Sequence, residues 1–112
     1  MSVATDRELL EFAAKAAGLS FQSHNVTDHG VYCNDATWWN PLTDDGHALR
    51  LGAALRLHIL HNDPGDSVLW VSAVLNKRGI HGVVEFQDEV QRADATRRAI
   101  VRAAAAIGRA MP

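Results

Sequence analysis

A strand-like run of the sequence is followed at once by a short turn and a second strand-like run. Residues 68–74 are rich in β-branched and aromatic side chains, and residues 80–86 have a similar character after a turn at residues 76–79. A turn this short joins antiparallel neighbours, because parallel strands need a crossover of a dozen residues or more. The chain is therefore predicted to contain a mostly antiparallel sheet.

Helix signals lie at both ends of the chain. Thr5 and Glu8 form a capping box, and apolar residues then recur at helical spacing as far as Gly18. Near the other end, residues 95–110 are rich in alanine and present one apolar stripe, which predicts a long helix that packs on the sheet. The polar residues 87–94 before this helix are expected to form a loop.

Between these ends the pattern predicts two further strands, a helix and another strand. Strands are expected to begin at residues 19–21 and at residues 31–33, with a polar loop at residues 22–30 and with residues 37–39 pairing with the second strand as a hairpin. The next helix has Thr43 or Asp44 as its cap and Leu49 among its apolar positions, and residues 57–61 then form a strand.

The predicted element order is α-β-β-α-β-β-β-α. This order predicts the α+β class: a compact sandwich in which helices flank a mostly antiparallel sheet. A length of 112 residues favours a single domain over residues 1–112, because it lies near the commonest domain size.

Composition narrows the setting of the protein. A net charge of −2 gives no overall attraction to nucleic acid or to anionic lipid. A single cysteine, Cys33, excludes an intrachain disulfide and suits a reducing compartment. No apolar run approaches the length of a membrane span, and residues 1–7 lack the pattern of a signal peptide. We expect a cytoplasmic protein with no membrane association.

Catalytic and metal-binding patterns are weak. Among the six histidines, His58 and His61 are three apart in a predicted strand, so their side chains point to opposite faces and cannot share an ion. A lone Cys33 among apolar neighbours is typical of a small buried residue, and Asp44 and Asp45 are explained by capping a helix. We expect no enzyme activity, no metal and no cofactor.

Arginines gather on the side of the last helix opposite its apolar stripe. Arg98, Arg102 and Arg109 share this side at spacings of four and seven, as phosphate contacts would require. Nucleic-acid binding by this basic face is therefore one hypothesis. The favoured interpretation is a solvated face paired within the chain, with Asp94 and Arg98 as an i,i+4 ion pair. Self-association through the alanine-rich helix is a further alternative to its packing on the sheet.

Two of the three tryptophans are adjacent, at Trp38 and Trp39, ahead of Asn40 and Pro41. Strand geometry sends adjacent side chains to opposite faces, so the two tryptophans should have different surroundings. Trp39 is expected in the core, and Trp38 is the candidate for a binding contact at the surface.

Three segments in order, residues 6–10, residues 39–46 and residues 95–101, resemble small proteins of tailed phages and prophages. The chain is similar to the phage ABA-sandwich domain and, more loosely, to the Nin-region X type of phage protein. The similarity covers almost the whole chain and is weakest over residues 20–36 and 75–92. It implies helices that flank a sheet, in agreement with the element order, and it brings no catalytic residues.

The resemblance also implies a function. Small accessory proteins of phages often bind and block host machinery, so the chain is expected to inhibit a bacterial defence system, in the manner of an anti-CRISPR protein, by contact with a host defence protein or complex. An alternative is a module that sequesters a nucleotide, with Trp38 or Trp39 stacking on the base and the arginines binding phosphate.

Overall fold

The predicted hairpin forms two adjacent strands of a three-stranded antiparallel sheet, which we call sheet B. The computed structural model describes residues 4–112, so residues 1–3, part of the opening segment considered above, lie outside the described part. In sheet B, β5 (Leu69–Leu75) lies between β4 (His58–His61) and β6 (Ile80–Phe86). The turn between β5 and β6 is a short 3₁₀ helix, η1 (Asn76–Arg78), that ends at Gly79 with a positive φ of 63°.

A second antiparallel sheet, sheet A, precedes it in the chain. It contains β1 (Phe21–Thr27), β2 (Gly30–Cys33) and β3 (Trp38–Trp39) in that order. The prediction of a loop over residues 22–30 was wrong, because most of this stretch is strand β1. Its polar side chains misled the prediction: β1 is an edge strand whose register with β2 shifts between Phe21 and Val26, and most side chains between those two residues face solvent.

The helices begin close to their predicted caps. The Thr5 hydroxyl accepts a hydrogen bond from the Glu8 amide at the start of α1 (Asp6–Ala16), and the Asp44 carboxylate accepts one from the His47 amide at the start of α2 (Asp45–Ala54). Leu49 is not part of the core, however: its side chain is 71% exposed.

The last helix starts earlier than predicted. A second 3₁₀ turn, η2 (Glu89–Gln91), carries a capping box formed by Asp88 and Gln91, and α3 (Arg92–Ala110) follows without interruption. Part of the predicted loop at residues 87–94 is therefore helical. Polar side chains there accept hydrogen bonds from the free amides at the start of the helix. A search for apolar residues at helical spacing cannot detect such a start.

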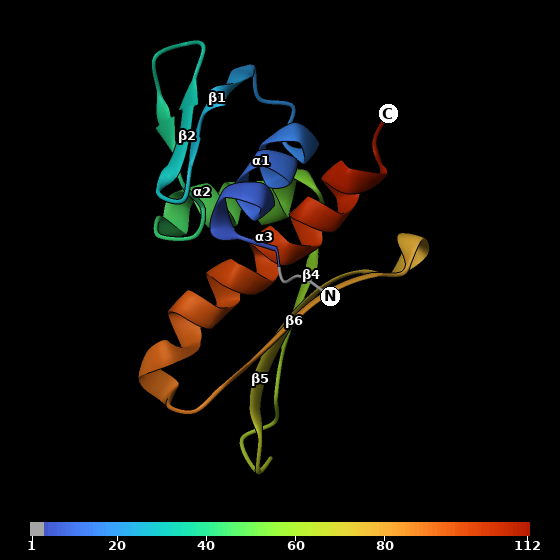
Figure 1. The fold of residues 1–112 in the computed structure, drawn as a ribbon. Helices are drawn as coiled ribbons and strands as arrows, with labels where there is room; N and C mark the ends of the chain where they lie inside the picture. Colours follow the sequence, from blue (N-terminus) through green and yellow to red (C-terminus); the bar gives the residue numbers. More distant parts are fainter. Residues whose placement is uncertain (1–3) are drawn as a thin grey trace.

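Helix α3 crosses the molecule diagonally and packs against α1, α2 and sheet B (Figure 1). The prediction that this helix packs on a sheet is confirmed. The α+β fold class is confirmed as well, with two differences in detail: three strands rather than two lie between the first two helices, and the strands divide into two separate sheets.

Small residues allow α3 to approach its neighbours closely. A Cβ atom at Gly82 of β6 would meet the carbonyl oxygen of Ala99 and would lie 2.8 Å from the amide nitrogen of Ala103. A Cβ atom at Gly108 would meet the carbonyl oxygen of Phe12 in α1. Backbone therefore packs on backbone at both contacts of α3, and neither glycine can gain a side chain without a shift of the helix.

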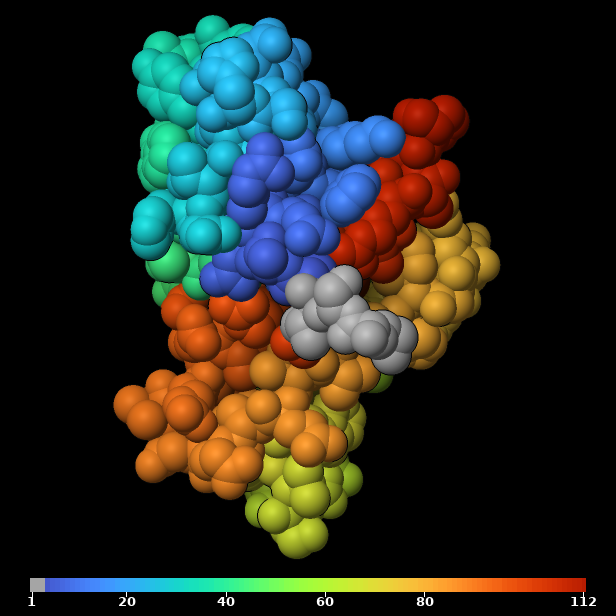
Figure 2. Space-filling view, viewed as in Figure 1, coloured from blue at the N-terminus to red at the C-terminus, as the bar shows by residue number. Residues whose placement is uncertain are grey.

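The molecule is elongated, with extents of 45 × 31 × 30 Å. The space-filling view places the β1–β2 hairpin at one end and the turn between β4 and β5 at the opposite end (Figure 2). Within the described residues, no helix is both long enough and apolar enough to cross a bilayer.

Substituting Gly82 tests the close packing of α3. We expect Gly82→Ala to lower the free energy of unfolding by roughly 1–3 kcal/mol, because the new methyl group forces α3 away from β6. Urea unfolding measures this loss. Gly65→Ala is the matched control, because nothing lies within 4 Å of a Cβ atom there, and it should leave stability nearly unchanged. Equal effects of the two substitutions would contradict the packing described.

Candidate binding surface around Trp38 and Trp39

The two adjacent tryptophans of β3 point to opposite faces of sheet A. Trp38 is 47% exposed, whereas Trp39 is partly buried and packs against the hydrophobic core. The predicted division, with Trp39 inside and Trp38 at the surface, is confirmed. The role of Trp38 in binding stays a prediction.

Tyr32 joins Trp38 at the surface. The two residues are directly opposite each other on β2 and β3, and their ring centroids lie 6.2 Å apart with an angle of 43° between the planes. Tyr32 is 45% exposed. We call this cross-strand pair the aromatic pair. It was not identified from the sequence, because Tyr32 was assigned only to a strand. The register of residues 31–33 against Trp38 and Trp39 would have revealed it.

The Trp38 ring is seated on a glycine. A Cβ atom at Gly30 would lie 2.9 Å from ring atoms Cε2 and Cζ2 of Trp38, and Gly30 has a positive φ of 138°, which side chains rarely allow. The ring therefore occupies the space that a side chain at position 30 would fill. The ring of Trp38 is thus packed against Gly30 on one side and lies beside Tyr32.

Asn40 fixes the end of β3 to its surroundings. Its side-chain Nδ2 donates to the carbonyl oxygen of His29 at 2.8 Å, and its Oδ1 accepts from the Leu42 amide at 2.9 Å. Its own amide donates to Nδ1 of His47 at 3.0 Å. Asn40 is only 6% exposed, and all of these groups are satisfied. The Asn-Pro segment after the tryptophans thus clamps β3 to the β1–β2 turn and to α2.

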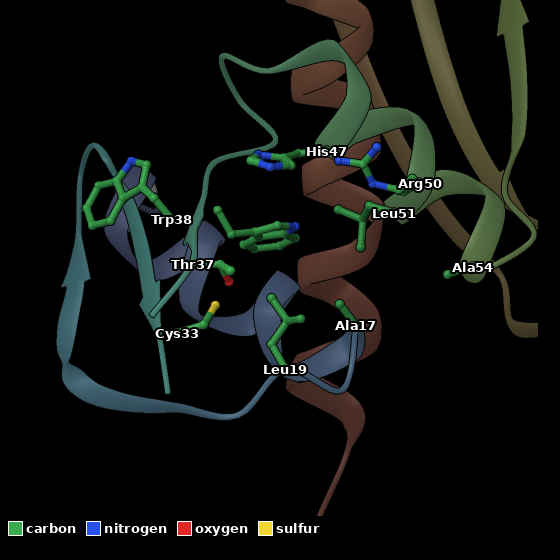
Figure 3. A pocket seen from close by; sticks show the side chains of 10 residues that line it. Ala17, Leu19, Cys33, Thr37, Trp38, His47, Arg50, Leu51 and Ala54 are labelled. Carbon is green, nitrogen blue, oxygen red and sulfur yellow. The ribbon is translucent and has the colours of Figure 1, made fainter. Parts of the chain in front are cut away.

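A pocket of about 320 Å³ opens behind the aromatic pair (Figure 3). Its polar groups come from Thr37 on the sheet side and from His47 and Arg50 on α2. Because Nδ1 of His47 accepts a hydrogen bond, the neutral ring carries its proton on Nε2, which is left as a donor. The other lining residues are mainly apolar: Ala17, Leu19, Cys33, Trp38, Trp39, Leu51 and Ala54.

Arg50 was not among the predicted site residues, although a signal for it exists. His47, Arg50, Leu51 and Ala54 are spaced three, four and seven apart, so they share one face of α2. Among residues 4–112, Arg50 forms no ion pair within 4 Å. Its charge nevertheless contributes, after the His47 amide, to lowering the pKa of Asp44 below its ordinary value. Arg50 therefore lines the pocket with a guanidinium that has no ion-pair partner within 4 Å among the described residues.

Cys33 lines the same pocket with a buried thiol. Desolvation raises the pKa of this thiol above its ordinary value, so the protonated form predominates at neutral pH. Its Sγ lies 4.0 Å from the carbonyl oxygen of Val31. A raised pKa is the opposite of what a cysteine nucleophile requires.

The predicted arginines lie elsewhere and contact other parts of the chain. Arg98 pairs with Asp6 of α1 at 2.9 Å, the guanidinium of Arg102 donates to the carbonyl oxygen of Val83 at 3.0 Å, and Arg109 lies 5.0 Å from the ring centroid of Phe12. These contacts favour the interpretation of a face paired within the chain.

The predicted ion pair between Asp94 and Arg98 is absent from the described residues. Asp94 instead contacts Arg97 at 3.5 Å, because the carboxylate of Asp6 draws the guanidinium of Arg98 toward α1. Within residues 4–112, no group of three histidine, cysteine, aspartate or glutamate side chains is arranged to hold a metal ion.

Comparison with protein-family models, with curated proteins and with solved structures finds no match to this chain. The candidate site therefore rests on its own geometry.

Substituting Gly30 tests the seat of the Trp38 ring. We expect Gly30→Ala to change the near-ultraviolet circular dichroism of the tryptophans, because the new methyl group would displace the ring. Gly18→Ala is the matched control: its φ is also positive, at 74°, but nothing lies within 4 Å of a Cβ atom there. Gly18→Ala should lose roughly 1–2 kcal/mol from backbone strain. Gly30→Ala should lose more, because its methyl group also meets the backbone oxygen of Trp39. Identical spectra for the two variants would show that the ring does not depend on Gly30.

Proposed function

We propose that this protein is a non-catalytic binding protein that contacts its partner through the aromatic pair, Tyr32 and Trp38. The observation that carries this proposal is a pair of large aromatic side chains, each nearly half exposed, that lie beside each other on a short hairpin. Tyrosine and tryptophan are enriched among the residues that dominate binding energy at protein interfaces. A preordered side chain also loses little conformational entropy on binding.

The resemblance to small phage and prophage proteins supports a setting for this activity. In that setting the chain is an accessory protein in the cytoplasm of a bacterial host, and its partner is a protein or complex of the host defence system. The mode of action is then inhibition by occupancy, which requires a rigid contact surface and no catalytic group. The fold class agrees with the helices and sheet that the resemblance implies.

Removing the Trp38 side chain tests the proposal. We expect Trp38→Ala to weaken binding to the host partner by about 2 kcal/mol or more, which is roughly 30-fold in Kd. Retention of host proteins on the immobilised protein, followed by titration of the retained protein, measures this loss. Protection of phage from the defence system should fall in parallel.

Val90→Ala is the control for this substitution, because Val90 is 84% exposed but lies in η2, outside the aromatic pair. It should retain full binding and protection. If Trp38→Ala bound the host protein as tightly as Val90→Ala, the aromatic pair would not be the contact surface. If the wild-type protein neither retained a host protein nor protected phage, the inhibitory function would be rejected.

A second candidate function is sequestration of a small anionic ligand, such as a nucleotide. It is favoured by the pocket behind β3, whose volume of about 320 Å³ lies within the range of small-ligand sites. There Trp39 offers an aromatic ring and Arg50 offers a guanidinium that forms no ion pair among the described residues. Nucleic-acid binding through Arg98, Arg102 and Arg109 stays a prediction, with less support because each contacts another part of the chain.

A nucleotide panel tests the second candidate. A bound nucleotide at 100 times its Kd should stabilise the protein by about 2.7 kcal/mol and should quench tryptophan fluorescence. Arg50→Gln should abolish both effects. Arg78→Gln is the matched control, because Arg78 is an exposed arginine in η1, outside the pocket. The absence of stabilisation by every nucleotide of the panel would exclude this function.

A further inference from the structure

The two sheets have four edge strands, and three of these edges are short or occupied. On β1, the guanidinium of Arg7 donates to the carbonyl oxygen of Ser23 at 3.0 Å. On β6, the guanidinium of Arg102 donates to the carbonyl oxygen of Val83 at 3.0 Å. Strand β3 contains only Trp38 and Trp39. Side chains that contact an edge, and edges that are very short, prevent the addition of another strand.

The fourth edge, on β4, is open. The Asn62 amide donates to the carbonyl oxygen of Trp70, and the register continues as Leu60 opposite Ser72 and His58 opposite Val74. In an antiparallel pair alternate residues direct their backbone groups toward the partner strand, so Ile59 and His61 direct theirs away from β5. Among residues 4–112, no backbone group bonds to these outward groups of Ile59 and His61.

An apolar groove of about 390 Å³ runs beside this open edge. Its walls are formed by Ala48 and Leu49 of α2 and by Ala93 and Ile100 of α3, and Ile59 of β4 lines it as well. Leu49, at a position predicted to be buried, is 71% exposed and lines this groove. A further strand at the β4 edge would cover Leu49 and would direct alternate side chains into the groove.

The charges around the groove indicate an uncharged occupant. Arg97 and Asp45, which both line the groove, form an ion pair with each other at 2.6 Å. Strand β4 itself has the sequence His-Ile-Leu-His, without a lysine, arginine, aspartate or glutamate that would repel an added strand. Nothing in the groove therefore requires a charged side chain, and Leu49, Ile59 and Ile100 favour aliphatic ones.

We propose that the β4 edge binds an extended segment of a partner protein, which adds to sheet B as a fourth strand and places apolar side chains from alternate positions in the groove. The backbone of Ile59 and His61 supplies the hydrogen bonds, and the groove selects the side chains, as in other cases of strand addition. This surface is independent of the aromatic pair, so the proposal does not rest on the function proposed above.

A lone segment fits this edge better than a second copy of the chain. Two copies joined through β4 would bring both α2 helices to the same side of the seam, where each helix already forms a wall of its own groove. Packed helices need about 8–10 Å between their axes, whereas neighbouring strands are only about 4.8 Å apart. A lone strand brings only its side chains to the groove.

Selection from a displayed library of random eight-residue peptides tests the proposal. The full chain should enrich peptides with an aliphatic residue at every second position. Synthetic versions of these peptides should bind about tenfold or more weakly to Leu49→Lys, because the lysine places a charge in the groove. Val90→Lys is the matched control, since Val90 is also exposed but does not line the groove. Trp38→Ala should leave peptide binding unchanged, which separates this surface from the aromatic pair.

The backbone contribution is tested on the peptide, so that the fold of the protein is not disturbed. N-methylation of alternate peptide amides should abolish binding when the methyl groups face β4, and should have little effect when they lie at the intervening positions. The proposal is overturned if no peptide is enriched, if enriched peptides bind Leu49→Lys as well as Val90→Lys, or if both methylation patterns act equally. A concentration-dependent dimer that Leu49→Lys disrupts would assign the edge to a second copy and would also overturn it.

Discussion

The structure depends on the close approach of α3 to its neighbours. Gly82 and Gly108 remove the side chains that would separate α3 from β6 and from α1, and the alanines of α3 complete a smooth surface. Sheet A and sheet B are held in one molecule mainly because both α1 and sheet B pack against this helix. The helix thus adds a smooth alanine surface to a core that also contains large apolar side chains such as Leu10, Val71 and Val101, and its alanines lose almost no side-chain entropy on folding.

Contacts distant in sequence then fix how the parts are oriented. The ion pair between Arg98 and Asp6 links residues 92 positions apart, and the contact of Arg97 with Asp45 links α3 to the start of α2. Asn40 fixes the orientation of sheet A. Its side chain donates a hydrogen bond to the β1–β2 turn, and its backbone amide donates one to α2. A short hairpin that would be mobile alone is therefore held rigidly enough to present an ordered aromatic surface.

Local rules predicted those parts of the fold that depend on neighbouring residues. The β5–β6 hairpin, the caps at Thr5 and Asp44, and the opposite orientations of Trp38 and Trp39 all follow from spacing within a few residues. The start of β1 was predicted at residues 19–21, but its continuation through residues 22–27 was missed, because a polar edge strand with a register shift lacks the alternation that identifies a strand.

The candidate site was only partly predictable for a similar reason. Trp38 is recognisable alone, but its partner Tyr32 depends on the strand register, and Arg50 becomes a pocket residue only when α2 packs beside β3. The arginines of α3 suggested a basic face because their partners, Asp6, Val83 and Phe12, lie far away in the sequence.

The adjacency of Trp38 and Trp39 has a thermodynamic consequence. Both residues line the pocket, the ring of Trp38 is also half exposed on the outer face, and a single peptide unit joins the two residues. If an occupant of the pocket changes the affinity of the outer face for a protein, reciprocity requires that protein to change the affinity for the occupant by the same factor. Two neighbouring residues on a two-residue strand thus place a candidate small-ligand site and a candidate protein contact one peptide unit apart.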